Sequence, residues 1–169
     1  MEEIGMNKIK TEDAPKYFTE TIKENEDKVI ERALEILAKR IKEPGVALTS
    51  PDHVKDYLIL SLAELDYEVF MVLFIDNRNN LIAAEQMFRG TINSCSIYPR
   101  VIAQRALELN AISIILAHNH PSHGTQPSYE DKAMTNKIKR ALELLDIQVL
   151  DHLLIAGVSA FSFAEFGIL

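Results

Sequence analysis

Two short apolar runs constrain the fold of this chain more than any other feature of its sequence. Residues 69–75 are rich in Val, Phe, Leu and Ile, and residues 111–117 are almost continuously apolar. Runs of this length are typical of strands, and the second is typical of a strand buried inside a sheet. Polar residues interrupt both runs long before either could span a bilayer. The runs therefore predict a protein built around a sheet.

The rest of the sequence supplies helices to cover that sheet. Turn residues at 76–80 separate two extended segments, which predicts a hairpin. Pro99 opens a helix that Asn110 closes, and Gly157 marks a turn between the last two strands. The predicted helices span residues 51–65, 99–110 and 128–145, and the predicted strands span residues 68–75, 81–88, 111–117, 147–156 and 158–163. This arrangement is typical of an α/β layered fold with helices packed on a largely central sheet.

Residues 1–47 are predicted to form a helical extension of a domain that spans residues 48–169. Between residues 15 and 43, apolar side chains recur at three- and four-residue steps and form one stripe on a charged helix. The stripe contains Val29, Ala33, Leu37 and Ile41, and a Pro-Gly pair at 44–45 ends the helix. Such a stripe covers either the domain that follows or a second copy of the chain. A homo-oligomer formed through this amphipathic helix therefore stays open.

The composition narrows the functions open to the chain. It has 18 Lys and Arg against 25 Asp and Glu, and the net charge of −7 disfavours nucleic-acid binding through bulk charge. The single cysteine, Cys95, excludes disulfides within the chain and metal sites that need several cysteines, and it fits a reducing compartment. The polar N-terminus has no signal-peptide core. We expect a cytoplasmic protein that does not associate with membranes.

A candidate metal site follows the buried strand at residues 111–117. His118 and His120 are two residues apart in extended chain, so both rings point to the same side. Ser128 can cap the next helix, and Asp131 then lies in its first turn, where a carboxylate is favoured. Two imidazoles and one carboxylate are a ligand set of catalytic zinc that leaves one position open for water. On these residues alone, a Zn²⁺ site and a pair of hydrogen-bonded structural histidines are both open.

The spacing of these residues resembles the JAMM motif of the JAB/MPN superfamily. In that motif His-x-His is followed by seven residues, a serine, two residues and an aspartate. More closely, the chain resembles the bacterial RadC family. The matching segments are His-Asn-His-Pro-Ser at 118–122, Pro-Ser-Tyr-Glu-Asp at 127–131, Leu-Phe-Ile-Asp-Asn at 73–77, Phe-Arg-Gly-Thr at 88–91 and Leu-Asp-His-Leu at 150–153. The first 47 residues lack the helix-hairpin-helix pattern of longer RadC proteins, so the chain resembles a short member.

The resemblance implies a fold and an activity. The fold would be the JAB/MPN, cytidine-deaminase-like layered fold, in which helices flank a central mixed sheet. The activity would be that of a zinc-dependent metalloprotease or isopeptidase, with an unidentified peptide or isopeptide substrate. Zinc would be held by His118, His120 and Asp131, and it would activate the attacking water.

Two further residues receive catalytic roles from the resemblance. Glu68 matches the family's glutamate that exchanges a proton with the zinc water; the other reading is a strand-end carboxylate in solvent. Glu64 and Glu85 are reserves for this role. Ser128 is a helix cap on physical grounds and a hydroxyl donor to the developing oxyanion by resemblance, and both roles can hold at different stages.

Two other histidines lie near the motif. Where the RadC family usually has Gly-Asp, this chain has His123 and Gly124, and His123 is open to being a ligand, a substrate contact or an exposed loop residue. Asp151 and His152 are adjacent on a predicted strand, so their side chains face opposite ways and cannot both meet one metal. His152 is predicted to be a structural histidine with its hydrogen bonds satisfied.

Two alternative functions remain. The spacing of His118, His120 and His123 also matches the His-x-His-x-Asp-His motif of metallo-β-lactamase-like hydrolases, but Ser122 stands where the aspartate is required. A non-catalytic interaction module with a vestigial metal site is the second alternative, since the RadC name is associated with DNA repair. A zinc deaminase is excluded, because its Pro-Cys-x-x-Cys segment needs two cysteines and Cys95 is alone.

Overall fold

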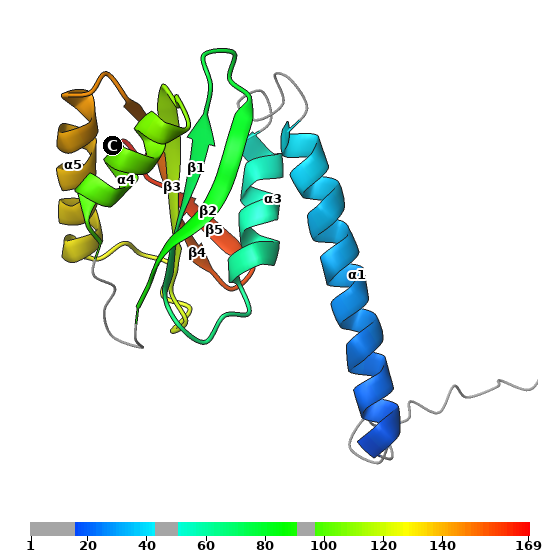
Figure 1. The fold of residues 1–169 in the computed structure, drawn as a ribbon. Helices are drawn as coiled ribbons and strands as arrows, with labels where there is room; N and C mark the ends of the chain where they lie inside the picture. The colour runs from blue at the N-terminus through cyan, green and yellow to red at the C-terminus, as the bar shows by residue number, and fades with distance from the viewer. Residues whose placement is uncertain (1–15, 43–50, 91–96) are drawn as a thin grey trace, which may run out of the picture.

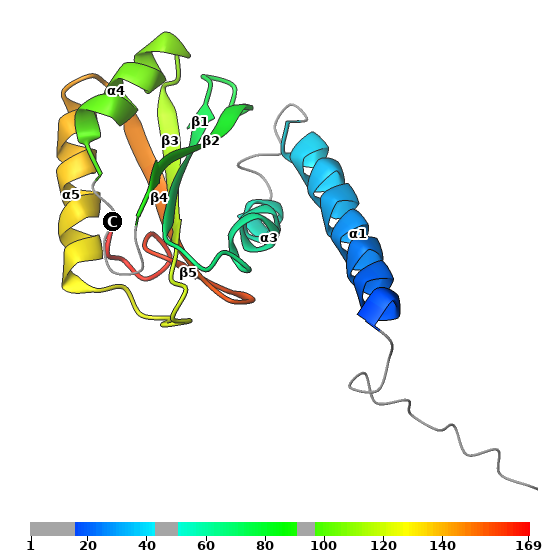
Figure 2. The same ribbon diagram turned by 60° about the horizontal axis from the view of Figure 1, so that its bottom comes forward.

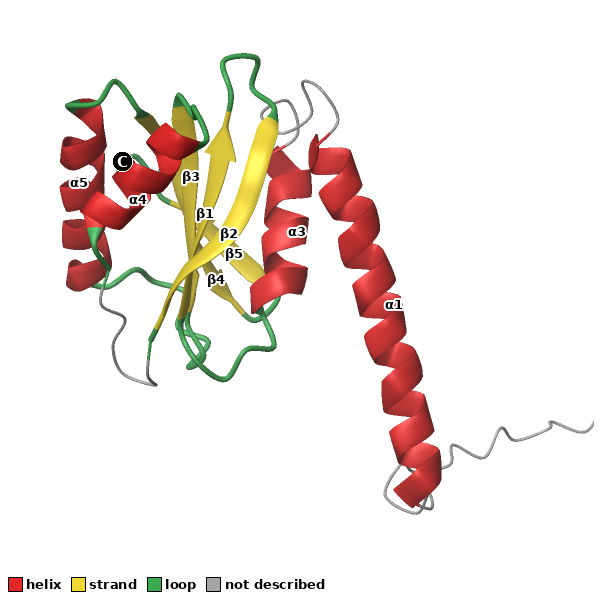
Figure 3. Cartoon of the chain, viewed as in Figure 1, coloured by secondary structure: helices red, strands yellow, loops and turns green. Residues whose placement is uncertain are grey.

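The computed structural model describes residues 16–42, 51–90 and 97–169 of the 169-residue chain. Its helices are α1 (Lys16–Lys42), α3 (Pro51–Leu62), α4 (Pro99–Glu108) and α5 (Tyr129–Glu143), and its strands are β1 (Val69–Ile75), β2 (Leu81–Arg89), β3 (Ser113–Asn119), β4 (Gln148–Ala156) and β5 (Ser159–Ser162). The predicted α/β fold is confirmed (Figure 3). Cys95 and the Pro-Gly pair at 44–45 lie outside the described residues.

One mixed five-stranded sheet, in the order β2-β1-β3-β4-β5, forms the centre of the domain. The predicted hairpin joins β1 and β2 as antiparallel neighbours. Its turn is held by the Asp76 carboxylate, which accepts hydrogen bonds of 2.8 Å from the backbone N–H groups of Arg78 and Asn80. β3 pairs with β1 in antiparallel fashion and with β4 in parallel, and the parallel connection runs through α5. Turning at Gly157, whose φ is +56°, β5 closes the sheet against β4 as predicted.

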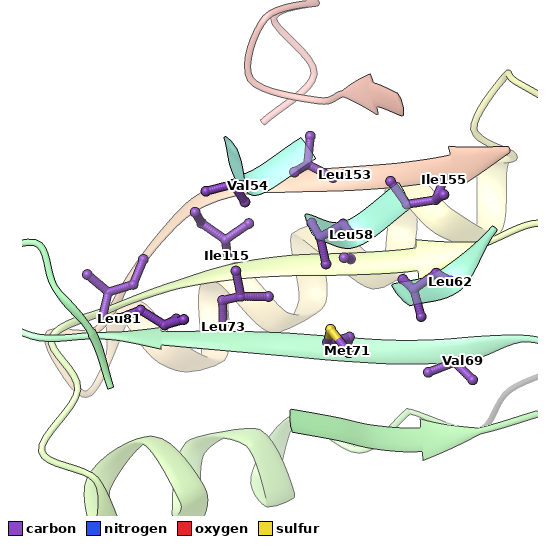
Figure 4. Close-up of a cluster of buried hydrophobic side chains, with 12 residues drawn as sticks. Val54, Leu58, Leu62, Val69, Met71, Leu73, Leu81, Ile115, Leu153 and Ile155 are labelled. Atoms are coloured by element: carbon purple, nitrogen blue, oxygen red, sulfur yellow. The ribbon is translucent and has the colours of Figure 1, made fainter. Parts of the chain in front are cut away.

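Helices cover both faces of this sheet, with α3 on one face and α4 and α5 on the other (Figures 1 and 3). Because side chains alternate along a strand, β1 sends Met71 and Leu73 toward α3 and sends Phe70 and Val72 toward α4 and α5. Figure 4 shows the α3 side, where Leu58 and its helix neighbours pack on β1, β3 and β4. All seven side chains of β1 are buried, as are all seven of β3, which agrees with the apolar runs in the sequence.

The long N-terminal helix α1 lies beyond α3, on the side away from the sheet (Figures 1 and 2). The predicted helix is therefore present, but no side chain between residues 23 and 39 is buried. Val29 on the apolar stripe is 68% exposed, whereas Ala33 and Leu37 are half-buried. The stripe is thus only partly covered within one chain, and a homo-oligomer through α1 stays a prediction. No helix in the described ranges is both long and apolar enough to cross a bilayer.

Predicted boundaries differ from the structure at α3, which ends at Leu62 and not at residue 65, and at both ends of β3. The apolar run predicts a strand over residues 111–117, but β3 runs from Ser113 to Asn119 because its pairing with β4 continues as far as Asn119 and Ile155. The backbone N–H of His120 then donates to the carbonyl of Ile155 at 2.9 Å, which extends the ladder by one more bond. His118 is therefore a residue of the sheet itself.

Candidate metal centre

The candidate site forms where the end of β3, the start of β1 and the start of α5 meet at one end of the sheet (Figure 1). His118 lies opposite Phe70 of β1 and beside Leu154 of β4, and its side chain is directed to the α5 face with theirs. His120 follows two residues later, and its ring points to the same side, as predicted. The two Nε2 atoms lie 3.2 Å apart.

The loop after β3 holds the His120 ring in place. The backbone N–H of His123 donates to the carbonyl of His120 at 2.9 Å, which closes a tight turn. The carbonyl of Gly124 then lies 2.9 Å from Nδ1 of His120. A carbonyl can only accept, so Nδ1 carries the proton and donates it. The lone pair of a neutral His120 ring is therefore on Nε2, the atom that faces His118.

Asp131 is held by the N-terminus of α5. Ser128 is the N-cap residue, and its hydroxyl oxygen accepts a hydrogen bond from the backbone N–H of Asp131 at 3.0 Å. The Asp131 Oδ2 atom accepts in return from the backbone N–H and the hydroxyl of Ser128, each at 2.7 Å. This reciprocal capping box fixes the carboxylate relative to the helix and leaves Oδ1 directed at His118.

The three predicted ligands converge. Nε2 of His118 lies 3.3 Å from Oδ1 of Asp131, and Nε2 of His120 lies 3.5 Å from Oδ2. Ligand bonds of about 2.0–2.1 Å at a tetrahedral angle would place neighbouring ligand atoms roughly 3.3–3.4 Å apart. The 3.2 Å between the two Nε2 atoms and the 3.3 Å from His118 Nε2 to Asp131 Oδ1 are close to this spacing. The 3.5 Å contact of His120 is with the other carboxylate oxygen, Oδ2, and one ligand atom from each of the three residues lies within 4.8 Å of the others. The three side chains therefore surround one position that suits a divalent ion. Among the described residues, His118, His120 and Asp131 are the His, Cys, Asp or Glu group that could hold a metal.

The electrostatics of the cluster agree with a cation site. Burial acts to raise the pKa of the Asp131 carboxyl, but interactions with the rings of His118 and His120 outweigh it and hold that pKa well below its usual range. The carboxylate of Asp131 raises the pKa of His120, and the charge of Glu68 adds to this effect. The site thus concentrates negative charge and nitrogen lone pairs at one point.

Glu68 lies beside this cluster. Glu68 comes immediately before β1, two residues ahead of Phe70, whose partner in β3 is His118. Extending this antiparallel register by two residues puts Glu68 near His120. The Asn119 side-chain oxygen accepts from the backbone N–H of Val69 at 2.8 Å, which ties the start of β1 to the end of β3. Glu68 is half-buried, and its charge reaches His120.

Other residues considered from the sequence are directed elsewhere. Glu85 is bound by the Arg105 guanidinium, with contacts as short as 2.7 Å, and these hydrogen bonds lower its pKa. Glu64 is exposed in the turn after α3. His123 is exposed and has a φ of +58°, and its ring lies against the turn at Gly157 and outside the metal-ligand group.

His152 is a satisfied buried histidine, as predicted, but it also contacts the site. Its Nε2 lies 2.8 Å from Nδ1 of His118, and its Nδ1 lies 2.6 Å from the hydroxyl of Thr135. Burial lowers the pKa of His152. Thr135 was not recognised from the sequence. The available signal was its position four residues after Asp131, which places both side chains on one face of α5.

Comparison with known proteins agrees with this geometry. A sequence model described as the RadC-like JAB domain matches residues 48–168. The chain is 49% identical to the UPF0758 protein YkfG of Escherichia coli K12 over 142 residues, which cover 84% of this chain and 90% of that protein. It is 47% identical to the UPF0758 protein YeeS of the same strain over 85% of this chain and 97% of YeeS.

A longer relative shows the same similarity over part of its length. The UPF0758 protein Mpe_A2695 of Methylibium petroleiphilum is 51% identical over 141 residues, which are 83% of this chain and 63% of that protein. The mixed sheet flanked by helices is that of the JAB/MPN fold, and His118, His120 and Asp131 form a group that could hold a metal ion. The chain belongs to the RadC-like JAB domain family.

Proposed function

We propose that this protein is a zinc-dependent hydrolase that cleaves a peptide or isopeptide bond with an activated water. The observation that carries the proposal is the convergence of His118, His120 and Asp131, in which one candidate ligand atom from each residue lies within 4.8 Å of the others. Two nitrogens and one oxygen leave a fourth tetrahedral position open, which is the pattern of catalytic zinc sites. Structural zinc sites are closed by four protein ligands and are rich in cysteine, whereas this set has three ligands and no cysteine.

Zinc is the ion that best suits these ligands. Imidazole nitrogens favour zinc and other late transition metals over magnesium and calcium, which prefer oxygen ligands. When bound, zinc would polarise the scissile carbonyl and lower the pKa of its water ligand from 15.7 toward about 7. The protein's part is to hold the three side chains close together before the ion binds, with His118 buried and with His120 and Asp131 half-buried.

Glu68 is proposed as the general base and then the general acid. Hydrolysis of an amide requires a group that removes a proton from the attacking water and gives a proton to the departing amine. Glu68 is a half-buried carboxylate just before the start of β1, and its charge reaches His120. Glu85 does not compete for this role, because Arg105 holds it.

Ser128 is proposed to orient Asp131 first and to assist the reaction second. Its hydroxyl proton is directed to Asp131 Oδ2 at 2.7 Å. A hydroxyl has one proton, so Ser128 would donate to a developing oxyanion only after releasing this contact. The backbone N–H of Ser128 also binds Oδ2, so the carboxylate would keep one support during such an exchange.

Metal analysis tests the proposal directly. Purified protein should contain about one zinc per chain by inductively coupled plasma mass spectrometry, and His118→Ala or His120→Ala should abolish this content. Glu68→Gln should keep the zinc and lose hydrolysis of a quenched-fluorescent peptide library and of isopeptide-linked lysine substrates. Zinc retained unchanged in both histidine variants would rule out the site.

The same preparation distinguishes the non-catalytic alternative. Binding of duplex DNA at physiological ionic strength, salt-dependent and unchanged by removal of the metal, would favour an interaction module associated with DNA. Lys132, Lys137 and Arg140 are exposed basic residues on α5, the helix that carries Asp131, so their replacement by Ala should then weaken that binding. The net charge of −7 argues against this outcome.

A further inference from the structure

A buried chain of hydrogen bonds extends from His118 away from the candidate metal position. Nδ1 of His118 lies 2.8 Å from Nε2 of His152, and Nδ1 of His152 lies 2.6 Å from the Thr135 hydroxyl. That hydroxyl lies 2.6 Å from the backbone carbonyl of Asp131. This series of hydrogen bonds thus begins at the ring of one candidate ligand, His118, and ends at the backbone of another, Asp131.

The residues that form these hydrogen bonds are enclosed in the core between the sheet and α5. His152 is 1% exposed and Thr135 is 2% exposed. The His152 ring stacks on Phe163 at 4.6 Å and meets the edge of Phe70 at 5.5 Å. Such packing leaves the ring little freedom to turn, so the partners of its two nitrogens are fixed.

The position of each proton follows from the last acceptor of the hydrogen-bond series, the backbone carbonyl of Asp131. A backbone carbonyl can only accept a hydrogen bond, so the 2.6 Å contact requires the Thr135 hydroxyl to donate its single proton to Asp131. The Thr135 oxygen must then accept from His152, which places the His152 proton on Nδ1. A ring that carries one proton has its lone pair on the other nitrogen, so Nε2 of His152 accepts from Nδ1 of His118.

We propose that Thr135 and His152 are positioning residues that hold His118 with its proton on Nδ1 and its lone pair on Nε2. This is the nitrogen that lies 3.3 Å from Asp131 and 3.2 Å from His120. The proposal deepens the proposed function, because it assigns the residues that prepare His118 to bind a divalent ion. Only the role in metal binding rests on the proposed function, because the hydrogen bonds among these residues are present without an ion.

The use of a second histidine makes Thr135 necessary. A histidine that ligates a metal commonly donates its other N–H to a carboxylate, a carbonyl or water, and these groups can accept without changing their own protonation. Histidine can instead offer either a lone pair or an N–H at Nε2, depending on its tautomer. Thr135 removes this ambiguity, because its own proton is already committed to the carbonyl of Asp131.

Nuclear magnetic resonance of the metal-free full chain tests the tautomers directly. With ¹⁵N-labelled histidine, long-range ¹H–¹⁵N correlations at pH 8 report which nitrogen of each ring carries the proton. We expect Nδ1–H for both His118 and His152 in the wild-type protein. A wild-type His118 with its proton on Nε2 would overturn the proposal, and this measurement needs no variant.

Substitutions at Thr135 then test its role. Thr135→Val keeps the shape but removes the oxygen, so we expect His118 to lose its uniform Nδ1–H signature and zinc affinity to fall about 10- to 100-fold. Thr135→Ser restores the hydroxyl and should rescue both readouts to within about twofold. Ser113→Ala changes a residue that is 4% exposed at the opposite end of β3, and it is the matched control for a loosened core.

The readouts separate this proposal from the proposed function. If Thr135→Val leaves the tautomer and the zinc affinity unchanged, the positioning role is wrong although a zinc site can still be correct. If the wild-type chain binds no divalent ion, the proposed function fails, and the tautomers of the metal-free chain still decide the positioning role. Zinc affinity is measured by competition with a chromophoric chelator, and circular dichroism checks that each variant is folded.

Discussion

Replacement of Ser128 by glycine separates two roles that one hydroxyl performs. The Ser128 oxygen caps α5 by accepting from the backbone N–H of Asp131, and its proton binds Asp131 Oδ2 at 2.7 Å. Glycine is itself a tolerated N-cap residue, so Ser128→Gly should cost the metal-free protein only a few tenths of a kcal/mol. Ser128→Ala should cost about 1 kcal/mol, because alanine is a poor N-cap residue.

Both substitutions should weaken zinc binding, since both remove the hydroxyl that supports the carboxylate. Loss of such support typically costs 10- to 100-fold in metal affinity. The backbone N–H of Ser128 still binds Oδ2 at 2.7 Å in either variant, so we expect the lower figure, about tenfold. At a free zinc concentration of about 100 times the wild-type Kd, zinc should stabilise the wild-type protein by about 2.7 kcal/mol. A tenfold weaker variant should gain only about 1.4 kcal/mol at that concentration.

Urea unfolding with and without zinc measures these quantities. Ser128→Gly should resemble the wild-type protein without zinc and lose about half of the stabilisation that zinc gives. Ser128→Thr keeps both the cap and the hydroxyl, and it serves as the matched control. If zinc stabilises Ser128→Gly by the full 2.7 kcal/mol or so, the hydroxyl does not support Asp131, and the reasoning from the capping box is refuted.

Three other perturbations have expected outcomes. Glu68→Gln should lower amide hydrolysis by about 10²- to 10⁴-fold while zinc affinity changes little, and equal loss of zinc in a chelator competition would instead make Glu68 a ligand. His123→Gly should stabilise the protein to urea by about 0.5–1 kcal/mol, because relief of the strained φ of +58° exceeds the greater chain entropy of glycine; unchanged or lower stability would contradict this. Arg105→Leu should destabilise the protein at pH 7, because hydrogen bonds from Arg105 lower the pKa of Glu85 in the folded state. That stabilisation is present above the unfolded pKa of Glu85 and disappears as pH falls through its folded pKa. The urea midpoints of the wild-type and Arg105→Leu proteins should therefore converge in acid. A difference that stays constant with pH would refute the assignment.

Much of the fold could be predicted from local sequence patterns. The apolar runs located β1 and β3, and the turn residues after Ile75 located the hairpin. Ser128 and Asp131 form the predicted helix cap and first turn of α5, and their spacing alone is enough for the reciprocal capping box. These features depend on interactions between residues a few positions apart, so they can be predicted from the sequence.

The ends of β3 could not be predicted from local sequence patterns. Ile112 is exposed and Ser113 begins the strand, whereas the predicted strand covered residues 111–117. The strand continues to Asn119 because Ile155, far along the chain, supplies a partner in β4. Hydropathy locates an apolar run, but hydrogen bonds to a distant strand set its ends.

By itself, the sequence determined the spacing of two histidines and an aspartate, the strand parity that turns both rings to one side, and the cap that fixes Asp131. Only the tertiary structure brought Glu68 near His120, paired Glu85 with Arg105, and joined His152 to Thr135 behind His118. The physical reason is the range of the interactions. Alternation and capping act over two to four residues, whereas these pairings depend on strand register and on the packing of α5 against the sheet.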